Sequence, residues 1–163
     1  MVLSTLPLMM AAAFASGQAG GAGSSADLSV IANAGPCGPQ IRTAEFMKLS
    51  LAQRRAKLTC LNRISVAQLD RTLPKLVDTK TMLESVTASG ATVIYHHVVD
   101  VAVEELKAAG GPSALMAQVR PKIRDKVCGA SDMRTMVHAG TVYRYEWADR
   151  NGKPIGSVAI ESC

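Results

Sequence analysis

The four cysteines of this 163-residue chain, Cys37, Cys60, Cys128 and Cys163, constrain its fold more than any other feature. Cys163 is the last residue, and a terminal residue is normally the most loosely held part of a domain unless a bond fastens it. An even number of cysteines in a small chain is typical of a disulfide-stapled domain from an oxidising compartment. The cysteines therefore predict a small domain held by two disulfides, but they identify no biochemical activity.

The pairing of these cysteines is a separate question, because four cysteines allow three connectivities and sequence leaves the choice open. We expect Cys37–Cys60 and Cys128–Cys163, since the predicted order of helices and strands brings these segments together. Each bond would stabilise the fold by roughly 3–4 kcal/mol. Zinc binding is disfavoured because the chain has no Cys-x-x-Cys pair and its three histidines lack zinc-finger spacing. No metal and no cofactor is expected.

Residues 1–26 are predicted to be a signal peptide followed by a flexible spacer. The apolar run Val2–Phe14 is shorter than the roughly 20 residues that a transmembrane helix needs. A small-x-small pattern ends at Ala15, and a stretch rich in Gly and Ser follows it. We expect cleavage near Ala15, with Ala22 and Ala26 as alternatives, and hence a periplasmic or secreted protein. The segment lacks the usual N-terminal Lys or Arg, so the true start site stays open.

The net charge of +5 is concentrated in residues 42–63, which carry six basic side chains and one acidic one. We identify a candidate basic patch there, formed by Lys48, Arg54, Arg55 and Lys57. A nucleic-acid surface would need aromatic side chains interleaved with these residues to stack on bases, and none is present between them. A solvated helix face is therefore the favoured interpretation, and no nucleic-acid partner is expected.

The mature chain is expected to form one domain over residues 27–163. Its two parts are a basic N-terminal helical segment at 42–72 and a sheet-containing core at 73–163. Apolar residues recur at helical spacing over 42–58 and again over 113–128, which predicts a helix in each segment.

Strands are predicted from runs rich in Val, Ile, Thr and aromatic residues. The clearest run is 91–100, and a shorter edge strand is expected within 75–88. Residues 141–147 and 154–161 predict a C-terminal hairpin whose turn lies at 149–152. The expected fold is therefore α+β, with a small antiparallel sheet of three or four strands packed against helices on one face.

Three of the few aromatic residues, Tyr143, Tyr145 and Trp147, fall on one face of a predicted strand, and Tyr95 is expected to join them. Aromatic side chains are enriched in binding hot spots, so this set is the candidate binding surface. The competing interpretation, which is favoured, places these rings in the core beneath the helices. Exposure of the rings would indicate a partner surface.

Sequence motifs for catalysis are absent. The chain has no Gly-rich phosphate loop, no His-Glu-x-x-His and no Gly-x-Ser-x-Gly. The adjacent His96 and His97 point to opposite faces of a strand, so we expect one ring in the sheet core and the other facing solvent. No catalytic residue is assigned, and the chain is not expected to be an enzyme, although a cleft joining either histidine to a carboxylate would favour one.

The C-terminal part of the chain, about 90 residues long, resembles small secreted proteins of Gram-negative bacteria. The residues that carry the resemblance are Leu73–Asp78, Thr81, Leu83, Tyr95, Cys128, Gly140, Tyr143, Tyr145, Asp149, Gly152, Lys153, Ile160 and Cys163. The pattern is similar to quorum-sensing-regulated virulence factors and, more distantly, to one class of type II secretion pilotins. The resemblance implies an α/β sandwich with a disulfide and a non-enzymatic periplasmic role. Residues 42–63 lie outside it.

These observations favour a non-enzymatic periplasmic or secreted protein that binds a protein partner and helps to assemble a secretion or envelope structure. The first alternative is a secreted inhibitor or immunity-like protein that blocks an enzyme. The second is a small hydrolase. The identity of the partner and the oligomeric state stay open.

Overall fold

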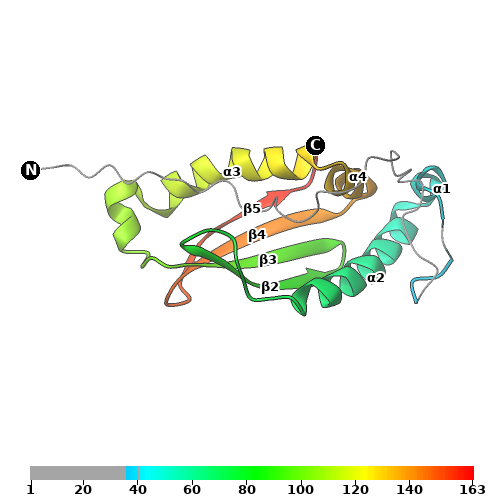
Figure 1. Ribbon diagram of the computed structural model, residues 1–163. Helices are drawn as coiled ribbons and strands as arrows, with labels where there is room; N and C mark the ends of the chain where they lie inside the picture. Colours follow the sequence, from blue (N-terminus) through cyan, green and yellow to red (C-terminus); the bar gives the residue numbers. More distant parts are fainter. Residues whose placement is uncertain (1–35, 40) are drawn as a thin grey trace, which may run out of the picture.

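A sheet of five strands in the order β1-β2-β3-β4-β5 forms the centre of the protein, as seen in a computed structural model (Figure 1). The structure describes residues 36–39 and 41–163. The predicted signal peptide and spacer at 1–26, with cleavage near Ala15, lie outside the described residues. Within the described ranges, none of the helices combines the length and apolar character needed to cross a membrane.

The helices and strands alternate only in part along the chain. The helical elements are α1 (Thr43–Lys48), α2 (Leu51–Asp70), the 3-10 helix η1 (Glu105–Ala109), α3 (Gly111–Gly129) and α4 (Ser131–Ala139). The strands are β1 (Lys75–Leu76), β2 (Thr81–Ser89), β3 (Thr92–Val99), β4 (Val142–Asp149) and β5 (Pro154–Ile160).

The sheet is mixed. Strands β1 and β2, β2 and β3, and β4 and β5 pair antiparallel, whereas β3 and β4 run parallel with Thr92 opposite Val142 and Val99 opposite Asp149. The predicted α+β class is confirmed, but the sheet has five strands where three or four were expected, and its central pair is not antiparallel. The reason is the connection between β3 and β4, which contains η1, α3 and α4 and returns the chain to the end of the sheet where β3 begins.

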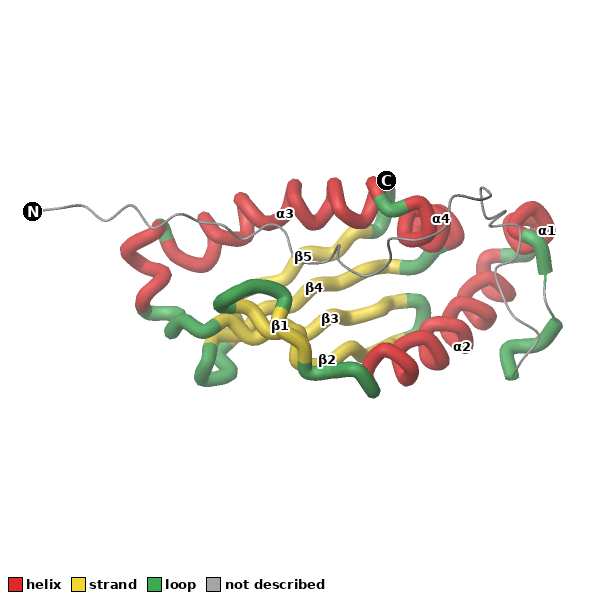
Figure 2. Tube along the Cα trace, in the orientation of Figure 1, coloured by secondary structure: helices red, strands yellow, loops and turns green. Residues whose placement is uncertain are grey.

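All three long helices contribute apolar residues to a single core on one face of the sheet. Helix α2 packs against β2 and α3 packs against β5, so the two helices cover opposite edges of the same face, with β3 and β4 between them (Figure 2). Side chains on alternate residues of each strand point to this covered face and are buried there. The other face of the sheet carries no helix of the described chain.

Two helices, α1 and α2, occupy the region where a single helix was predicted over 42–58, because α2 begins at its own N-cap, Ser50. The Ser50 hydroxyl accepts the Gln53 N–H (3.3 Å), and the Gln53 side chain accepts the Ser50 N–H (3.0 Å). This reciprocal capping box separates α1 from α2. At its other end, Asp70 accepts the N–H of Val86 (3.1 Å) beside an irregularity in β2, which fixes α2 over the sheet.

Helix α3 comes close to β5 at Gly156. A Cβ atom built on Gly156 would lie 2.6 Å from Cγ of Met116, so any larger residue would require Met116 to move. Pro121 lies inside α3, yet the helix continues through it from Gly111 to Gly129.

The two predicted disulfides are confirmed. Cys37 pairs with Cys60 across a Cα–Cα distance of 5.6 Å, and Cys128 pairs with Cys163 across 5.5 Å. The first bond joins the segment before α1 to the middle of α2, and the second joins the end of α3 to the last residue of the chain. No described cysteine is free.

Candidate functional site

Aromatic rings form a continuous stack along the centre of the covered face. The parallel register of β3 and β4 places Tyr95 opposite Tyr145 and His97 opposite Trp147. The ring centroids of Tyr95 and Tyr145 are 4.8 Å apart at an interplanar angle of 9°, and those of His97 and Trp147 are 5.4 Å apart at 20°. Such pairs contribute about 0.5–1.5 kcal/mol each beyond the area they bury. We call the rings of Tyr95, Tyr143, Tyr145, His97 and Trp147 the aromatic floor of the covered face.

The candidate binding residues on this stack are mostly buried. Tyr143, Tyr145 and Trp147 are only 8%, 6% and 8% exposed and belong to the main core, while Tyr95 is half-buried. Burial raises the pKa of Tyr95, Tyr143 and Tyr145, so these phenols are neutral at physiological pH. The rings are core residues rather than a freely exposed surface, and only part of the set reaches a pocket.

That pocket lies between α2 and the aromatic floor and has a volume of about 270 Å³; we call it the α2 pocket. Its lining residues are Leu61, Asn62, Ser65, Val66, Leu69, Val93, Tyr95, Met136 and Tyr143. Two predicted residues, Tyr95 and Tyr143, are therefore brought together here, whereas Tyr145 and Trp147 are not among the lining residues. The pocket is mainly apolar, with polar atoms supplied by α2 and by the two tyrosines.

Asn62 is the unusual residue of the α2 pocket, and the sequence analysis missed it. Its side chain is only 3% exposed, and its amide nitrogen has no hydrogen-bond partner in the structure. A buried donor without an acceptor destabilises a fold by about 1–3 kcal/mol, so its retention needs an explanation. The available signal was a polar residue between Leu58 and Val66, within the stripe of α2 that faces the sheet.

His97 is held in the aromatic stack as a neutral ring. It is 5% exposed, and burial lowers its pKa to about 4, with the nearby Lys126 acting in the same direction. Its Nδ1 atom has no hydrogen-bond partner. The prediction that one of the two adjacent histidines packs into the sheet is confirmed, and that histidine is His97.

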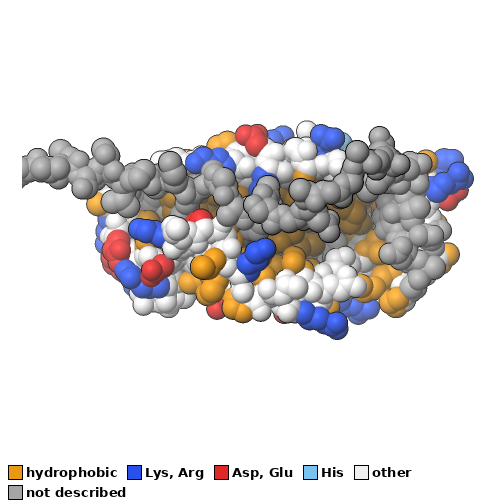
Figure 3. All heavy atoms as spheres, in the orientation of Figure 1, with side chains coloured by type: hydrophobic (Ala, Val, Ile, Leu, Met, Phe, Trp, Pro, Cys, Tyr) orange, Lys and Arg blue, Asp and Glu red, His pale blue; other side chains and the backbone are white. Residues whose placement is uncertain are grey.

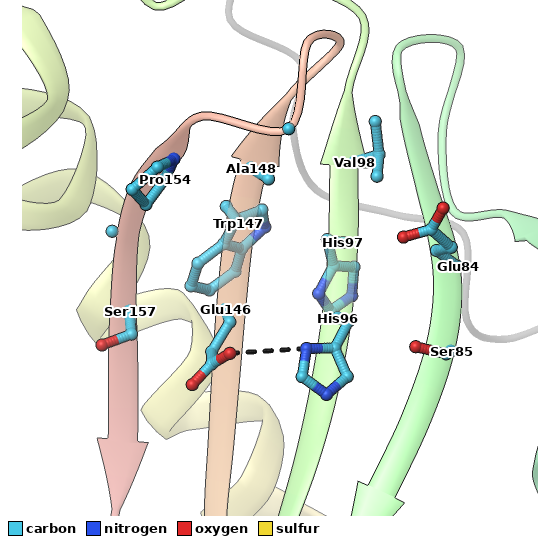
Figure 4. A pocket seen from close by; sticks show the side chains of 12 residues that line it. Glu84, Ser85, His96, His97, Val98, Glu146, Trp147, Ala148, Pro154 and Ser157 are labelled. Carbon is cyan, nitrogen blue, oxygen red and sulfur yellow. Dashed lines mark ion pairs between the residues drawn. The ribbon is translucent and has the colours of Figure 1, made fainter.

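His96 lies on the opposite, uncovered face of the sheet, in a shallow pocket of about 530 Å³ (Figure 4). Its Nδ1 is 3.4 Å from Oε2 of Glu146, and its Nε2 is 2.9 Å from Oγ1 of Thr87. A hydroxyl, an imidazole and a carboxylate are thus connected in the order found in hydrolytic triads. The cleft that would favour an enzyme is therefore present, although acyl transfer also needs donors for the oxyanion.

Backbone donors for an oxyanion are scarce around His96. Strands β3 and β4 are each paired with a strand on both sides, so their N–H groups are used by the sheet. In the described part of the chain, no cluster of three or more His, Cys, Asp or Glu side chains could hold a metal ion. The Thr87–His96–Glu146 relay therefore has a base and a hydroxyl, but the described residues around it offer few oxyanion donors and no metal site.

The predicted basic patch is divided by the fold. Lys48 and Arg55 are exposed, but Arg54 is half-buried. Lys57 is also half-buried, and it donates to the carbonyl oxygens of Cys37 (3.3 Å) and Pro39 (3.4 Å). Lys57 therefore holds the N-terminal segment in place, Arg54 is partly enclosed, and Lys48 and Arg55 remain available on the surface.

No protein-family model matches this chain, and comparison with curated proteins finds no match. Two solved structures share its fold. One is a protein of Pseudomonas aeruginosa provisionally described as secreted (TM-score 0.56, 16% identity, covering 69% of this chain and 95% of that one). The other is EpsS, the pilotin of the Vibrio vulnificus type 2 secretion system (TM-score 0.55, 15% identity, covering 67% and 92%). At these identities the similarity establishes the fold alone.

Proposed function

We propose that this protein is a non-enzymatic binding and assembly protein of the bacterial envelope that holds an apolar segment of a protein partner in the α2 pocket. The observation that carries the proposal is the unpartnered amide of Asn62 in an apolar pocket floored by Tyr95 and Tyr143. A backbone carbonyl of the partner would accept the free N–H of Asn62. The partner would thereby remove the unfavourable free energy of an unsatisfied buried donor.

The size of the α2 pocket favours a protein partner over a cofactor. Small-molecule sites usually enclose about 300–1,000 Å³, and the α2 pocket is smaller than this range. Its volume suits one or two apolar side chains anchored from a larger surface. The exposed Leu69, at the rim of the pocket, extends the apolar area toward solvent.

Two further observations support an envelope role. Both disulfides are of the kind that persists in oxidising compartments, as the predicted periplasmic or secreted location requires. The fold is shared with a pilotin of a type 2 secretion system, and the sequence resembles that group and the quorum-sensing-regulated virulence factors. We therefore propose a component of a secretion or envelope structure as the partner.

The proposal is tested by affinity capture with the mature, oxidised protein and a variant whose pocket is filled. Ser65→Trp places a large ring in the α2 pocket, while Ser157→Trp places the same ring on the uncovered face as a matched control. We expect the wild type and S157W to capture the same envelope protein and S65W to lose at least about 10-fold of it. Equal capture by S65W and S157W would contradict the proposal.

A hydrolase is the second candidate function, and the Thr87–His96–Glu146 relay is the observation that favours it. A fluorophosphonate reagent labels hydroxyl nucleophiles that a histidine activates. Because the sheet leaves few oxyanion donors near His96, we expect no labelling of Thr87. Labelling that His96→Ala abolishes would favour the hydrolase over the binding protein.

A further inference from the structure

The corner between α1 and α2 carries exposed apolar side chains next to exposed basic ones. It lies at the end of the molecule beyond the sheet (Figure 1). Met47 is 44% exposed and Leu51 is 52% exposed. The exposed Lys48 follows Met47, and the exposed Arg55 lies about one helical turn after Leu51. We call these four residues the α1–α2 tip. Figure 3 shows Lys and Arg side chains together with hydrophobic ones at this end.

The positive charge of the tip is not neutralised within the described part of the chain. The one acidic residue of the segment, Glu45, is paired with Arg42 at 2.7 Å. The charged side-chain groups of Lys48 and Arg55 form no ion pair or hydrogen bond with a described residue, in contrast to the Lys57 ammonium. The tip therefore presents uncompensated positive charge around two apolar side chains.

Packing and a disulfide hold α1 against α2 in the absence of a partner. Phe46 of α1 and Leu58 of α2 are fully buried in one cluster with Ala139. The Cys37–Cys60 bond fastens the segment before α1 to α2. A surface that is already ordered loses little conformational entropy when it binds.

We propose that the α1–α2 tip docks this protein on a bilayer surface that contains anionic phospholipid. Basic side chains are attracted to such a surface, by about fivefold in affinity for each one close to it. Apolar side chains that project among them insert at the boundary between headgroups and acyl chains, as Met47 and Leu51 would. Nucleic acid is a poorer match, because the aromatic residue nearby, Phe46, is buried and cannot stack on bases.

Docking at the tip leaves the α2 pocket accessible. Both sites lie on α2, but Leu51 and Ser65 are separated by about 20 Å along the helix axis. The proposal therefore does not depend on the proposed function, and the two can fail separately. The pocket variant S65W is expected to bind vesicles as the wild type does.

Vesicle flotation with the mature, oxidised protein tests the proposal. Vesicles of phosphatidylcholine are compared with vesicles containing about 30% phosphatidylglycerol, an anionic lipid. We expect the wild type to bind the anionic vesicles at low salt and not the neutral ones. The double variant Lys48→Glu/Arg55→Glu should lose at least about 20-fold in affinity. Met47→Ser/Leu51→Ser should also weaken binding, including at about 0.5 M salt, where the charges are screened.

The matched control is Lys122→Glu/Arg124→Glu, which reverses two exposed basic side chains of α3 and changes the net charge equally. It should bind anionic vesicles within about twofold of the wild type. Circular dichroism establishes that each variant is folded. Absence of wild-type binding, or equal loss in the control and the tip variant, would overturn the proposal. A further outcome is that the wild type captures an acidic protein but binds no vesicles, and that the tip variants no longer capture that protein. The tip would then be a protein surface, and the proposal would fail.

Discussion

At the residue scale, His97 shows how the covered face fixes the state of a titratable group. Its pKa is lowered to about 4 because the ring is buried, whereas an unfolded chain protonates histidine near pH 6.5. As the pH falls between these two values, the unfolded state binds a proton that the folded state does not. Folding stability that is present above about pH 6.5 is therefore lost as the pH approaches about 4.

This gives a prediction for unfolding by urea. We expect the free energy of unfolding to fall by up to about 3 kcal/mol between about pH 7 and about pH 4 because of His97, in addition to the contribution of the carboxylates. His97→Phe should remove that part of the pH dependence. His138→Phe, which changes an exposed histidine of α4, is the control and should retain it. Identical pH profiles for H97F and H138F would refute the assignment.

Individual residues also show what sequence could and could not predict. The opposite orientations of His96 and His97 follow from strand geometry alone, so they were predictable. The role of Asn62 was not, because a polar residue on a helix faces water in most proteins and only tertiary packing encloses it here. The sharing of Tyr95 and Tyr143 by one pocket likewise depends on the pairing of two distant strands.

At the element scale, the close approach of α3 to β5 makes a testable prediction. Gly156→Ala would place a Cβ atom 2.6 Å from Cγ and 2.9 Å from Sδ of Met116. Overpacking of this kind destabilises a protein by about 1–3 kcal/mol. Met116→Ala in the same chain makes room for the new methyl group, so part of the loss in G156A should be recovered in the double variant.

A double-mutant cycle measured by chemical unfolding isolates this interaction. Ser157→Ala, the neighbouring exposed position on β5, is the control and should change stability by less than about 0.5 kcal/mol. Additive effects of G156A and M116A would show that the contact does not constrain the α3–β5 spacing.

Elements set by local chemistry were predicted best. The hairpin β4–β5 follows from the Asp149–Gly152 turn, and β3 follows from its β-branched run. The parallel pairing of β3 with β4 was not predicted, because the intervening helical connection carries no local signal for strand direction. The division between α1 and α2 depends on the Ser50–Gln53 capping box, which the analysis of apolar spacing did not consider.

At the scale of the whole molecule, the two disulfides hold separate parts of the fold. Replacing Cys128 and Cys163 with Ser frees the end of the chain from α3 and should lower the free energy of unfolding by roughly 3–4 kcal/mol. Urea unfolding of this variant, compared with the wild type before and after reduction, measures the effect. Reduced wild type should be at most as stable as the variant, and an unchanged unfolding midpoint in the variant would contradict the role of this bond.

The global prediction was accurate for class and for disulfides, since both depend on composition, periodicity and cysteine positions. The shared fold with a pilotin and a protein described as secreted agrees with the resemblance carried by the C-terminal residues. The candidate binding site was only partly predicted. The aromatic residues were identified, but which of them are core and which line a pocket is decided by where α2 lies over the sheet.

Site-specific photocrosslinking in cells tests most directly whether the α2 pocket holds a protein partner. A photoreactive residue replaces Leu69 at the pocket rim or, as the control, Ser157 on the uncovered face. We expect a crosslinked envelope or secretion component from position 69 that disappears when S65W fills the pocket, and no such product from position 157. The same product from both positions, or one from position 69 that persists with S65W, would contradict it.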